Sequence, residues 1–352
     1  MLEQQIETPA LVLDLDIFER NLSKAVQICS TAGIALRPHF KTVKCTALAH
    51  REIEAGAVGM CCAKVSEARV LVESGIEDVY IANQVTDKSK IALAARLAGQ
   101  CRLSLCVDSE DVVRELEQAA EFFGSRIYVL VELDVGMNRC GVTTKEAFFD
   151  LVTLINSCEH LSFDGIQAYA GHLAHCENQT QRDKESSEAE EQVRELLTFL
   201  NEKGVTVDRI TGMSTGTLEL RAVPGTLYTE AQCGSFAFMD TSYLAVGAGF
   251  EPSLSVLTTV MNTYQDHTTF DAGVKSFGMD QRPPAFLEFP DAVIEFSEEH
   301  MTIPVPDCQA GQRYHLIPGH CCTTINGYDS LYLVRRGRVM DKIPVDGRGM
   351  SV

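Results

Sequence analysis

A chain of 352 residues with 45% hydrophobic side chains is long enough for one large α/β domain and a smaller second domain. Thirty basic against 49 acidic residues give a formal net charge of -19, which repels nucleic-acid phosphates and anionic lipid headgroups. No apolar run reaches the roughly 18 residues of a membrane span, and MLEQQIETPA lacks the basic and apolar parts of a secretory signal. We therefore expect a cytoplasmic protein without nucleic-acid or membrane partners.

Short apolar runs alternate with longer amphipathic stretches through the first two thirds of the chain. After a strand-like ALVLD, the pattern DIFERNLSKAVQICSTAG predicts a helix that ends at a glycine. Strands are then predicted at IALRPHF, VGMCCAK, DVYIANQ, RLSLCVD, RIYVLVELD, LSFDGIQAY, VDRITGM and TLYTEAQCG, with helical patterns between most of them. About eight βα units is the number that closes a parallel barrel, so we predict an α/β fold built on a TIM-like (β/α)8 barrel.

The pattern changes near Gly247. Turn residues separate the segments TVMNTY, PAFLEF, DAVIEF, HMTIPV, RYHLIP and SLYLVRRGRVM, which predicts a smaller, mostly antiparallel β domain. The opening strand ALVLD precedes the barrel strands, and we expect it to pair with this second domain. The predicted domains are therefore the barrel at residues 15–246 and the β domain at residues 1–14 plus 247–352.

Thirteen cysteines give little sign of chemistry. None forms a C-x-x-C pair, and most lie within apolar runs, where a thiol behaves as a small core hydrophobe. Without a secretory signal we expect no disulfide framework. Among the adjacent cysteine pairs, only the one in PGHCCTT has a sequence context that suggests chemistry.

The stretch LRPHFKTVKC contains the first candidate for chemistry. Strand alternation would put Arg37, His39 and Lys41 on one face, with Lys41 facing inward at the carboxyl end of the first barrel strand. Barrels of this kind carry their chemistry on the loops after those ends. An inward lysine there is costly to desolvate unless it is neutralised or made covalent, which favours a Schiff-base lysine. A lysine whose ammonium reaches solvent at the barrel rim is the equally weighted alternative.

Two later segments favour the covalent alternative for Lys41. Both are turns rich in hydroxyls or glycine after the last two barrel strands, where such barrels usually hold a phosphate. Each turn alone is more often a cap than an anion site. Together with a lysine amine they suggest a phosphorylated aldehyde cofactor, namely pyridoxal phosphate. The residues concerned are Ser214, Thr215, Gly216, Thr217, Gly234 and Ser235.

The segments RPHFKTVKC, VELDVGMNRCGV, GIQAYAGHLAH, STGT, GSFAFMD and PGHCCTT resemble, in this order, motifs of the alanine-racemase-like (fold type III) pyridoxal-phosphate enzymes. The most similar branch contains D-threonine aldolase, D-3-hydroxyaspartate aldolase and dehydratase, and metal-dependent D-serine dehydratase. The resemblance covers essentially the whole chain. It implies that Lys41 carries the cofactor. Lys44 is the less favoured candidate, because Val43 stands where the family usually has a histidine.

The resemblance also implies roles for residues after the fifth and sixth barrel strands. Arg139 matches the arginine that hydrogen-bonds the cofactor's phenolic oxygen, and a rim salt bridge with Asp134 is the structural alternative. Gln167 and Tyr169 share a strand face, and in the family that tyrosine lies beside the cofactor. Without the resemblance, a buried core tyrosine would be the default interpretation.

His320 and Cys322 in IPGHCCTT are candidate metal ligands. In a strand, residues two apart point the same way, so both side chains could converge on one ion while Cys321 faces away. Taken alone, this spacing is more often core packing. A site with two protein ligands would leave positions for water and substrate. The resemblance implies a divalent metal here, and the sulfur ligand favours zinc over manganese or magnesium.

The resemblance implies a lyase that acts on a small D-amino acid with a β-hydroxyl, to which the metal binds. If His175 deprotonates that hydroxyl, with His172 as the competing residue, the products are glycine and an aldehyde. If Lys41 removes the α proton instead, the products are a keto acid and ammonia. We favour the D-threonine or D-3-hydroxyaspartate type of aldolase, because His175 is present, and keep the dehydratase as the alternative. A racemase, a non-catalytic pyridoxal-phosphate protein and a barrel hydrolase are less favoured. A homodimer is expected from the relatives.

Overall fold

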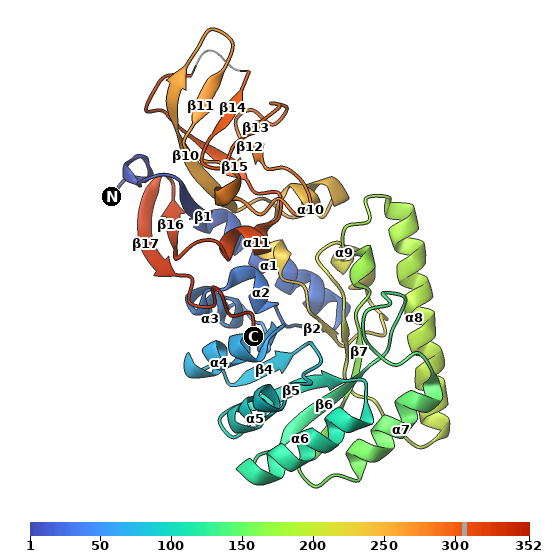
Figure 1. The fold of residues 1–352 in the computed structure, drawn as a ribbon. Coiled ribbons are helices and arrows are strands. Elements are labelled where there is room, and N and C mark those ends of the chain that lie inside the picture. Colours follow the sequence, from blue (N-terminus) through green and yellow to red (C-terminus); the bar gives the residue numbers. More distant parts are fainter. Residues whose placement is uncertain (305–307) are drawn as a thin grey trace. The chain divides into compact units, whose positions relative to one another are not determined.

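The computed structural model describes residues 1–304 and 308–352. Its internal contacts divide the chain into two compact units, whose elements are labelled in Figure 1. The barrel unit comprises Lys24–Lys41, Leu48–Gly234 and Met350–Val352, and the β unit comprises Met1–Ser23, Thr42–Ala47 and Ser235–Gly349. The domain boundaries predicted from the sequence, after residues 14 and 246, remain a prediction, and they are not the same as the limits of these two units.

The barrel unit contains a parallel sheet in which each predicted barrel strand is present. The strands follow the order β2-β9-β8-β7-β6-β5-β4-β3, and a parallel bridge between His39 and Cys61 joins the segments of β2 and β3. The TIM-like fold class is therefore confirmed. The strands are β2 (Ala35–Leu36), β3 (Met60–Cys62), β4 (Asp78–Ile81), β5 (Arg102–Val107), β6 (Ile127–Glu132), β7 (Leu161–Ala168), β8 (Ile210–Gly212) and β9 (Glu230–Ala231).

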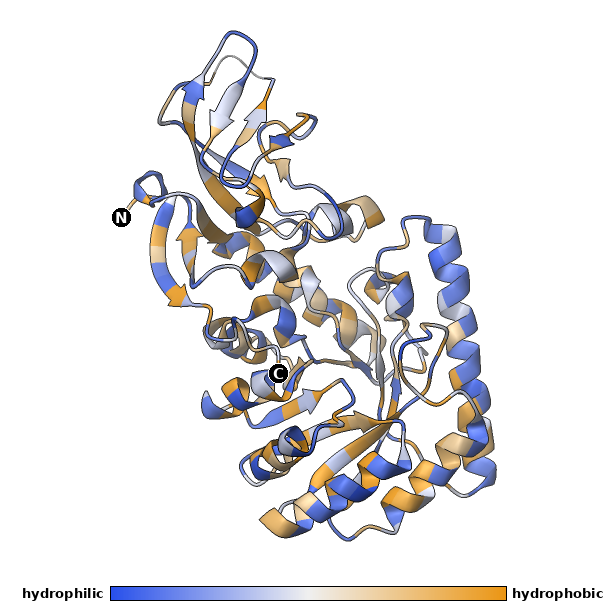
Figure 2. Ribbon diagram, in the orientation of Figure 1, coloured by the Kyte–Doolittle hydropathy of each residue, from blue (hydrophilic) through white to orange (hydrophobic). Residues whose placement is uncertain are grey.

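Amphipathic helices follow most of these strands, as their periodicity predicts. In α6, the residues Val112, Val113, Leu116 and Ala120 are buried on one face, and the helix ends at Gly124 with a left-handed φ of 61°. Figure 2 shows that α8 is hydrophilic over most of its length, whereas the barrel strands are largely hydrophobic. The longer helices are α1 (Leu15–Ala32), α3 (Thr46–Glu54), α4 (Val65–Glu73), α5 (Lys88–Leu97), α6 (Glu110–Phe123), α7 (Lys145–Asn156) and α8 (Gln179–Glu202).

The segment around Lys41 differs from its prediction. The strand β2 has only two residues, and Phe40–Val43 forms a helical turn, α2. The predicted alternation of Arg37, His39 and Lys41 along one extended strand is therefore wrong, because the chain leaves the strand conformation before Lys41. Phe40 and Val43 are fully buried on this turn, whereas the Lys41 side chain is exposed.

Charged side chains link the barrel strands β2, β7, β8 and β9. Glu230, the first residue of β9, accepts hydrogen bonds from Arg37 Nε at 2.9 Å and from Arg209 Nη2 at 2.8 Å. Arg209 also pairs with Asp164 through Nη1 at 2.6 Å. Burial raises the pKa of Glu230, but the two arginines outweigh burial and hold its pKa below the ordinary value. These groups neutralise one another, so the buried charges of the network are paired.

The β unit is built around the first strand of the chain. β1 (Ala10–Asp14) pairs antiparallel with β10 (Leu254–Thr263) and parallel with β16 (Ser330–Arg335), so the expected pairing of ALVLD with this part of the chain is confirmed. All other strand pairs of this sheet are antiparallel in the described residues. The remaining strands are β11 (Thr268–Phe270), β12 (Ala285–Phe286), β13 (Glu295–Phe296), β14 (Met301–Ile303), β15 (Arg313–Ile317) and β17 (Arg338–Pro344).

The strands predicted in the last third of the chain are present, although several are shorter than their patterns. The predicted strand HMTIPV ends at Val305, which lies outside the described residues. Short helices also belong to the β unit: α10 (Thr241–Val246) and α11 (Cys321–Ile325). Within residues 1–304 and 308–352, no helix combines the length and the apolar character that crossing a membrane requires.

Candidate active site

Lys41 presents the accessible amine that a covalent cofactor requires. Its side chain is exposed, and its backbone N–H donates to His39 Nδ1 at 3.3 Å. The competing Lys44 is 7% exposed, and its carbonyl accepts a hydrogen bond from the Gly347 N–H at 2.8 Å. Lys44 also has a left-handed φ of 50°, at the turn between α2 and α3. Its backbone therefore shapes this turn, which is consistent with a structural role.

Arg139 and Tyr169 come together from the loops after β6 and β7. The Arg139 Cζ atom lies 5.7 Å from the centroid of the Tyr169 ring. Asn138, just before Arg139, has a left-handed φ of 53°. The Asp134 Oδ1 atom accepts hydrogen bonds from the N–H groups of Gly136 and Asn138, each at 3.0 Å. Asp134 thus shapes the loop that carries Arg139.

Gln167 lies near the end of β7 and is 1% exposed. Its Oε1 atom accepts hydrogen bonds from Tyr80 Oη at 2.8 Å and from Gln232 Nε2. Gln232 Nε2 also donates to Thr211 Oγ1 at 2.9 Å. Burial raises the pKa of the Tyr80 hydroxyl well above its ordinary value, so this group stays a donor. Gln167 is therefore part of a polar network inside the barrel, and its contact with a cofactor stays a prediction.

The two candidate histidines follow Tyr169 on the same loop. His172 belongs to the helical turn η2 (Gly171–Leu173) and is exposed, whereas His175 is half-buried. Gly171 allows the loop to approach the tyrosine, because a Cβ atom there would lie 2.5 Å from Tyr169 Cε1. A general base works best where water is partly excluded, so the burial of His175 favours it over His172.

The STGT segment forms a buried turn between β8 and the short helix α9 (Leu218–Arg221). The Ser214 N–H donates to Thr217 Oγ1 at 2.9 Å, and the two hydroxyl oxygens lie 3.2 Å apart. Met213, before the turn, has a left-handed φ of 67°. Ser214, Thr215 and Thr217 are each at most 5% exposed. A compact turn of hydroxyls and backbone donors of this kind fits a phosphate group.

His320 and Cys322 lie close together, but the strand predicted for their segment is wrong. PGHCCTT is not a strand: His320 caps the helix α11, which begins at Cys321. The Cys322 side chain nevertheless lies close enough to His320 to raise the pKa of the imidazole. Cys321 is fully buried, and its N–H donates to Asp240 Oδ2 at 2.9 Å. The two predicted ligands therefore meet at the first turn of a helix.

A carboxylate holds the imidazole of His320. Asp280 Oδ2 lies 2.7 Å from His320 Nδ1, and the Asp280 Oδ1 atom accepts a hydrogen bond from Thr323 Oγ1 at 2.8 Å. Burial alone would lower the pKa of His320, but Cys322 and Asp280 outweigh burial and raise it to about 9. A carboxylate on the second imidazole nitrogen is the usual partner of a metal-binding histidine.

Two hydroxyls approach the sulfur of Cys322. Thr42 Oγ1, on the residue after Lys41 in the chain, lies 3.2 Å from Cys322 Sγ, and Ser235 Oγ lies 3.8 Å from it. In the described part of the chain, no group of three or more histidine, cysteine, aspartate or glutamate side chains could hold a metal. An imidazole with a thiolate fits zinc, and a pair of protein ligands would leave coordination positions for water and substrate.

Asp280 is a candidate site residue that the sequence did not reveal. It lies in the segment GVKSFGMD, 40 positions before His320. Gly278 shows how close this segment comes to α11, because a Cβ atom there would lie 1.8 Å from Thr323 Oγ1. A glycine such as Gly278 can indicate that two backbone segments approach closely, but it does not tell which segment the partner is. Residues 298–300, EEH, lie close to the start of the same segment, since a Cβ atom on Gly273 would lie 2.4 Å from the Glu298 carbonyl oxygen.

Backbone strain gathers in the loops that carry predicted site residues. Five non-glycine residues in the described chain have positive φ, and four of these follow barrel strands. Strain of this kind costs free energy and is often kept at functional sites. The fifth, Arg336, lies in the turn between β16 and β17. The four are Lys44, Asn138, Met213 and Met239.

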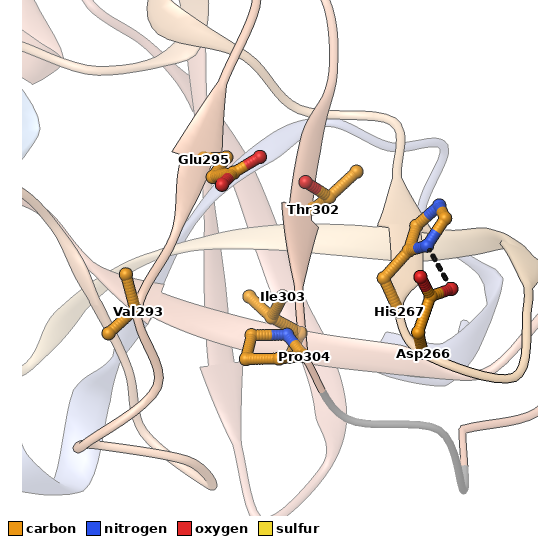
Figure 3. Close-up of a pocket in the computed structure, with 7 residues that line it drawn as sticks. All are labelled: Asp266, His267, Val293, Glu295, Thr302, Ile303 and Pro304. Atoms are coloured by element: carbon orange, nitrogen blue, oxygen red, sulfur yellow. Dashed lines mark hydrogen bonds and ion pairs between the residues drawn. The ribbon is translucent and has the colours of Figure 1, made fainter.

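The β unit also has a surface pocket with a volume of about 450 Å³, drawn in Figure 3. Asp266 and His267 line one side, with His267 Nδ1 2.8 Å from Asp266 Oδ1, and Glu295 and Thr302 lie on neighbouring strands. None of its lining residues is a predicted site residue. The pocket therefore adds nothing to the candidate active site.

Comparison with known proteins identifies the family. The model for "Alanine racemase, N-terminal domain" matches residues 13–242, and a second model, "Putative serine dehydratase domain", matches residues 253–334. D-threonine aldolase of an Arthrobacter species is 38% identical over 357 residues, which cover 99% of this chain and 94% of that protein. The chain belongs to the alanine-racemase-like family of D-threonine and 3-hydroxy-D-aspartate aldolases. Members of this family are pyridoxal-phosphate-dependent lyases, and the protein is an enzyme of this class.

Other members of the D-threonine aldolase family are similar to this chain over almost its whole length. 3-Hydroxy-D-aspartate aldolase of Paracoccus denitrificans is 35% identical over 363 residues, covering 99% of this chain and 93% of that protein. The crystal structure of D-threonine aldolase from Filomicrobium marinum superimposes with a TM-score of 0.95 at 34% identity, covering 99% of this chain and 98% of that one. The predicted combination of a TIM-like barrel with a mostly antiparallel β domain is therefore confirmed.

Proposed function

We propose that the protein is a pyridoxal-phosphate- and divalent-metal-dependent aldolase that cleaves D-β-hydroxy amino acids, of the D-threonine or D-3-hydroxyaspartate type, to glycine and an aldehyde. The observation that carries this proposal is the similarity over 99% of the chain to two proteins named as aldolases of such substrates. His175, half-buried after β7, supports the aldolase because cleavage of a β-hydroxy acid needs a base for the hydroxyl proton.

Residues of the barrel loops would hold the cofactor. Lys41 would bind it covalently through its amine, and Arg139 and Tyr169 would contact its ring, together with Gln167. The buried hydroxyls at Ser214–Thr217 support a phosphate site there, to which we also assign Gly234 and Ser235. Bound pyridoxal phosphate supplies an electron sink for the charge left when a bond to Cα breaks.

His320 and Cys322 would hold a divalent metal, for which zinc is the best match to a nitrogen and sulfur donor pair. Asp280 fixes the His320 ring through Nδ1 at 2.7 Å, which supports a ligand role for this histidine. A bound metal supplies a Lewis acid for the substrate's β-hydroxyl. The role of the protein is to orient the imidazole and to keep the sulfur beside it.

His175 would accept the proton of the β-hydroxyl, so that the Cα–Cβ bond breaks and an aldehyde leaves. Tyr169, which Gly171 allows to lie against the same loop, would orient the reacting groups. The dehydratase is the second candidate, because the resemblance implies that the metal-dependent dehydratases share the His320–Cys322 pair. In that reaction Lys41 would take the α proton and the products would be a keto acid and ammonia.

A comparison of substrates and metals tests this proposal. Cofactor-loaded protein is incubated with D-threonine, L-threonine or D-serine, first after treatment with a chelator and then with added zinc or manganese. The aldolase predicts glycine and acetaldehyde from the D-enantiomer alone, loss of activity on chelation, and recovery with metal. Glycine formation that survives chelation would contradict the metal's role, and pyruvate with ammonia from D-serine would favour the dehydratase.

A further inference from the structure

A chain of buried hydrogen bonds runs inside the barrel from Glu230 to Gln167. Thr211, on β8, donates from Oγ1 to Glu230 Oε1 at 3.1 Å. Gln232 Nε2 donates to Thr211 Oγ1 at 2.9 Å, and it also donates to Gln167 Oε1. Each of these four side chains is at most 4% exposed. The proposed chemistry uses only Gln167, near the carboxyl end of β7.

The charge of Glu230 gives this chain of hydrogen bonds one direction. Arg37 Nε and Arg209 Nη2 donate to its two oxygens, at 2.9 and 2.8 Å, so the carboxylate is ionised and can only accept. The single hydroxyl proton of Thr211 is therefore used on Glu230. Because the Thr211 oxygen must then accept from its other partner, Gln232 has to turn its Nε2 group toward Thr211.

The orientation of the Gln232 amide fixes the orientation of the Gln167 amide. Gln232 Oε1 lies 3.9 Å from the Cys61 sulfur, whose thiol donates to it, so the amide oxygen also has a partner. Of the two N–H bonds on Gln232 Nε2, one donates to Thr211 and the other to Gln167, which must therefore present its oxygen. Tyr80 Oη donates to the same Gln167 oxygen at 2.8 Å. Both acceptor sites of Gln167 Oε1 are thus occupied.

The nitrogen end of the Gln167 amide is left as an available donor. Gln167 Nε2 makes no hydrogen bond with the described residues, whereas Gln167 Oε1 makes two. This nitrogen is also not among the fully buried side-chain atoms that lack a partner in the described chain, so water or a ligand can reach it. Gln167 lies two residues before Tyr169, at the end of the barrel where folds of this kind carry their chemistry.

We propose that Thr211 and Gln232 are positioning residues that hold the Gln167 amide with its Nε2 group toward the cofactor, so that Gln167 donates to an unprotonated acceptor atom of the cofactor ring. The inference rests on the proposed function, specifically on Gln167 as a cofactor contact. An amide rotated the other way would present an oxygen to the same acceptor atom, and no hydrogen bond could form. Thr211 and Gln232 act on the cofactor only through Gln167.

The test measures the dissociation constant of the full chain for pyridoxal phosphate. Thr211→Val removes the hydroxyl but keeps the shape of the side chain, so the two amides are no longer held in one orientation. We expect binding about two- to fivefold weaker, because only molecules with the competent orientation bind. Thr211→Ser keeps the hydroxyl and should restore the affinity of the wild-type protein. Gln167→Met removes the donor itself and should weaken binding about tenfold.

Thr229→Val is the matched control, because it also removes a threonine hydroxyl from the barrel unit. Thr229 Oγ1 accepts a hydrogen bond from the Ile210 N–H at 2.9 Å, and in the described residues its hydroxyl bonds only to the backbone of Ile210. This control should leave the affinity for the cofactor as it is in the wild-type protein. A second comparison places Thr211→Val in a Gln167→Met background, where it should not weaken binding further.

The outcomes separate this inference from the proposed function. A wild-type protein that binds no pyridoxal phosphate would overturn the proposed function, and the inference would fall with it. If the wild-type protein binds the cofactor, equal affinities of Thr211→Val and Thr229→Val overturn the inference alone, as does a Thr211→Ser variant that binds no better than Thr211→Val. Further weakening in the Gln167→Met background would show that Thr211 does not act through Gln167. If Thr211→Val does not fold, wild-type affinity in Gln167→Met contradicts the donor role.

Discussion

Asp280 Oδ2 lies 2.7 Å from His320 Nδ1, so the carboxylate fixes the ring of the histidine whose pKa Cys322 also raises. The two residues are 40 positions apart in the chain. The contact assigns Nδ1 to the carboxylate and so points to Nε2 as the nitrogen that serves a metal. Such outer partners orient a ligand and raise its basicity, so they act on metal affinity without touching the ion.

Asp280→Asn should weaken zinc binding about 10- to 100-fold, because the amide no longer orients a basic imidazole. Asp266→Asn is the matched control: Asp266 also pairs with a histidine, His267, at 2.8 Å in the same unit, but that histidine has no predicted metal role. Competition with a zinc-binding dye measures both affinities. Equal affinities for the two variants would contradict the assignment of the metal site.

Lys41, rather than Lys44, should carry the cofactor. Borohydride reduction of cofactor-loaded protein, followed by peptide mapping, should place the pyridoxyl group on Lys41, because its amine is exposed whereas Lys44 is 7% exposed. Lys41→Ala should lose the visible band entirely. A label on Lys44 in the wild-type protein would show that the assignment from RPHFKTVKC selected the wrong lysine.

Glu230→Gln should lower the free energy of unfolding by about 3–5 kcal/mol, because Arg37 and Arg209 would then be buried with one partner fewer. Glu115→Gln breaks an exposed pair with Lys88 and should change stability by less than about 1 kcal/mol. Urea unfolding of both variants makes the comparison. A Glu230 variant as stable as the Glu115 variant would show that the buried network contributes little to stability.

Glu52 should make the protein less stable as the pH rises. This glutamate on α3 is fully buried, and neither carboxylate oxygen has a hydrogen-bond partner among the described residues, so burial raises its pKa well above 4.5. The folded state therefore keeps the proton at pH values where the unfolded state has lost it. Between the two pKa values, stability should fall by about 1.4 kcal/mol per pH unit.

Glu52→Gln should remove the part of the fall in stability with pH that Glu52 causes. The free energy of unfolding of this variant, relative to the wild-type protein, should therefore be greater at pH 8 than at pH 5. Glu54→Gln, on the exposed face of the same helix, should leave the slope as it is. Urea titrations at several pH values measure both variants. Parallel curves for Glu52→Gln and wild-type protein would contradict the account of a buried, protonated acid.

The barrel could be predicted because each strand is a short apolar run flanked by turn residues, as in RIYVLVELD for β6. The β unit could also be predicted, because the strand ALVLD lies outside the eight βα units and must pair with a strand elsewhere in the chain. Local conformation was harder. PGHCCTT was predicted as a strand, and so short a segment could not show that His320 is instead the N-cap residue of a helix that begins at Cys321. The helical turn at Phe40–Val43 was missed for the same reason.

The candidate site was partly readable from sequence. Lys41, Arg139 and Tyr169 lie in ordered motifs that the resemblance could match one by one. Asp280 could not be found this way, because its importance lies in a contact with His320, 40 positions away. The left-handed conformations of Asn138 and Met213 were equally hidden, since neither residue type demands a positive φ.

The most direct measurement is the product balance from D-3-hydroxyaspartate, a substrate open to both proposed reactions. Protein loaded with pyridoxal phosphate and zinc is incubated with it, and glycine, glyoxylate, oxaloacetate and ammonia are quantified. We expect equal amounts of glycine and glyoxylate, and their loss in His175→Asn but not in His172→Asn. Oxaloacetate and ammonia in place of glycine would contradict the aldolase and leave His175 without its proposed role.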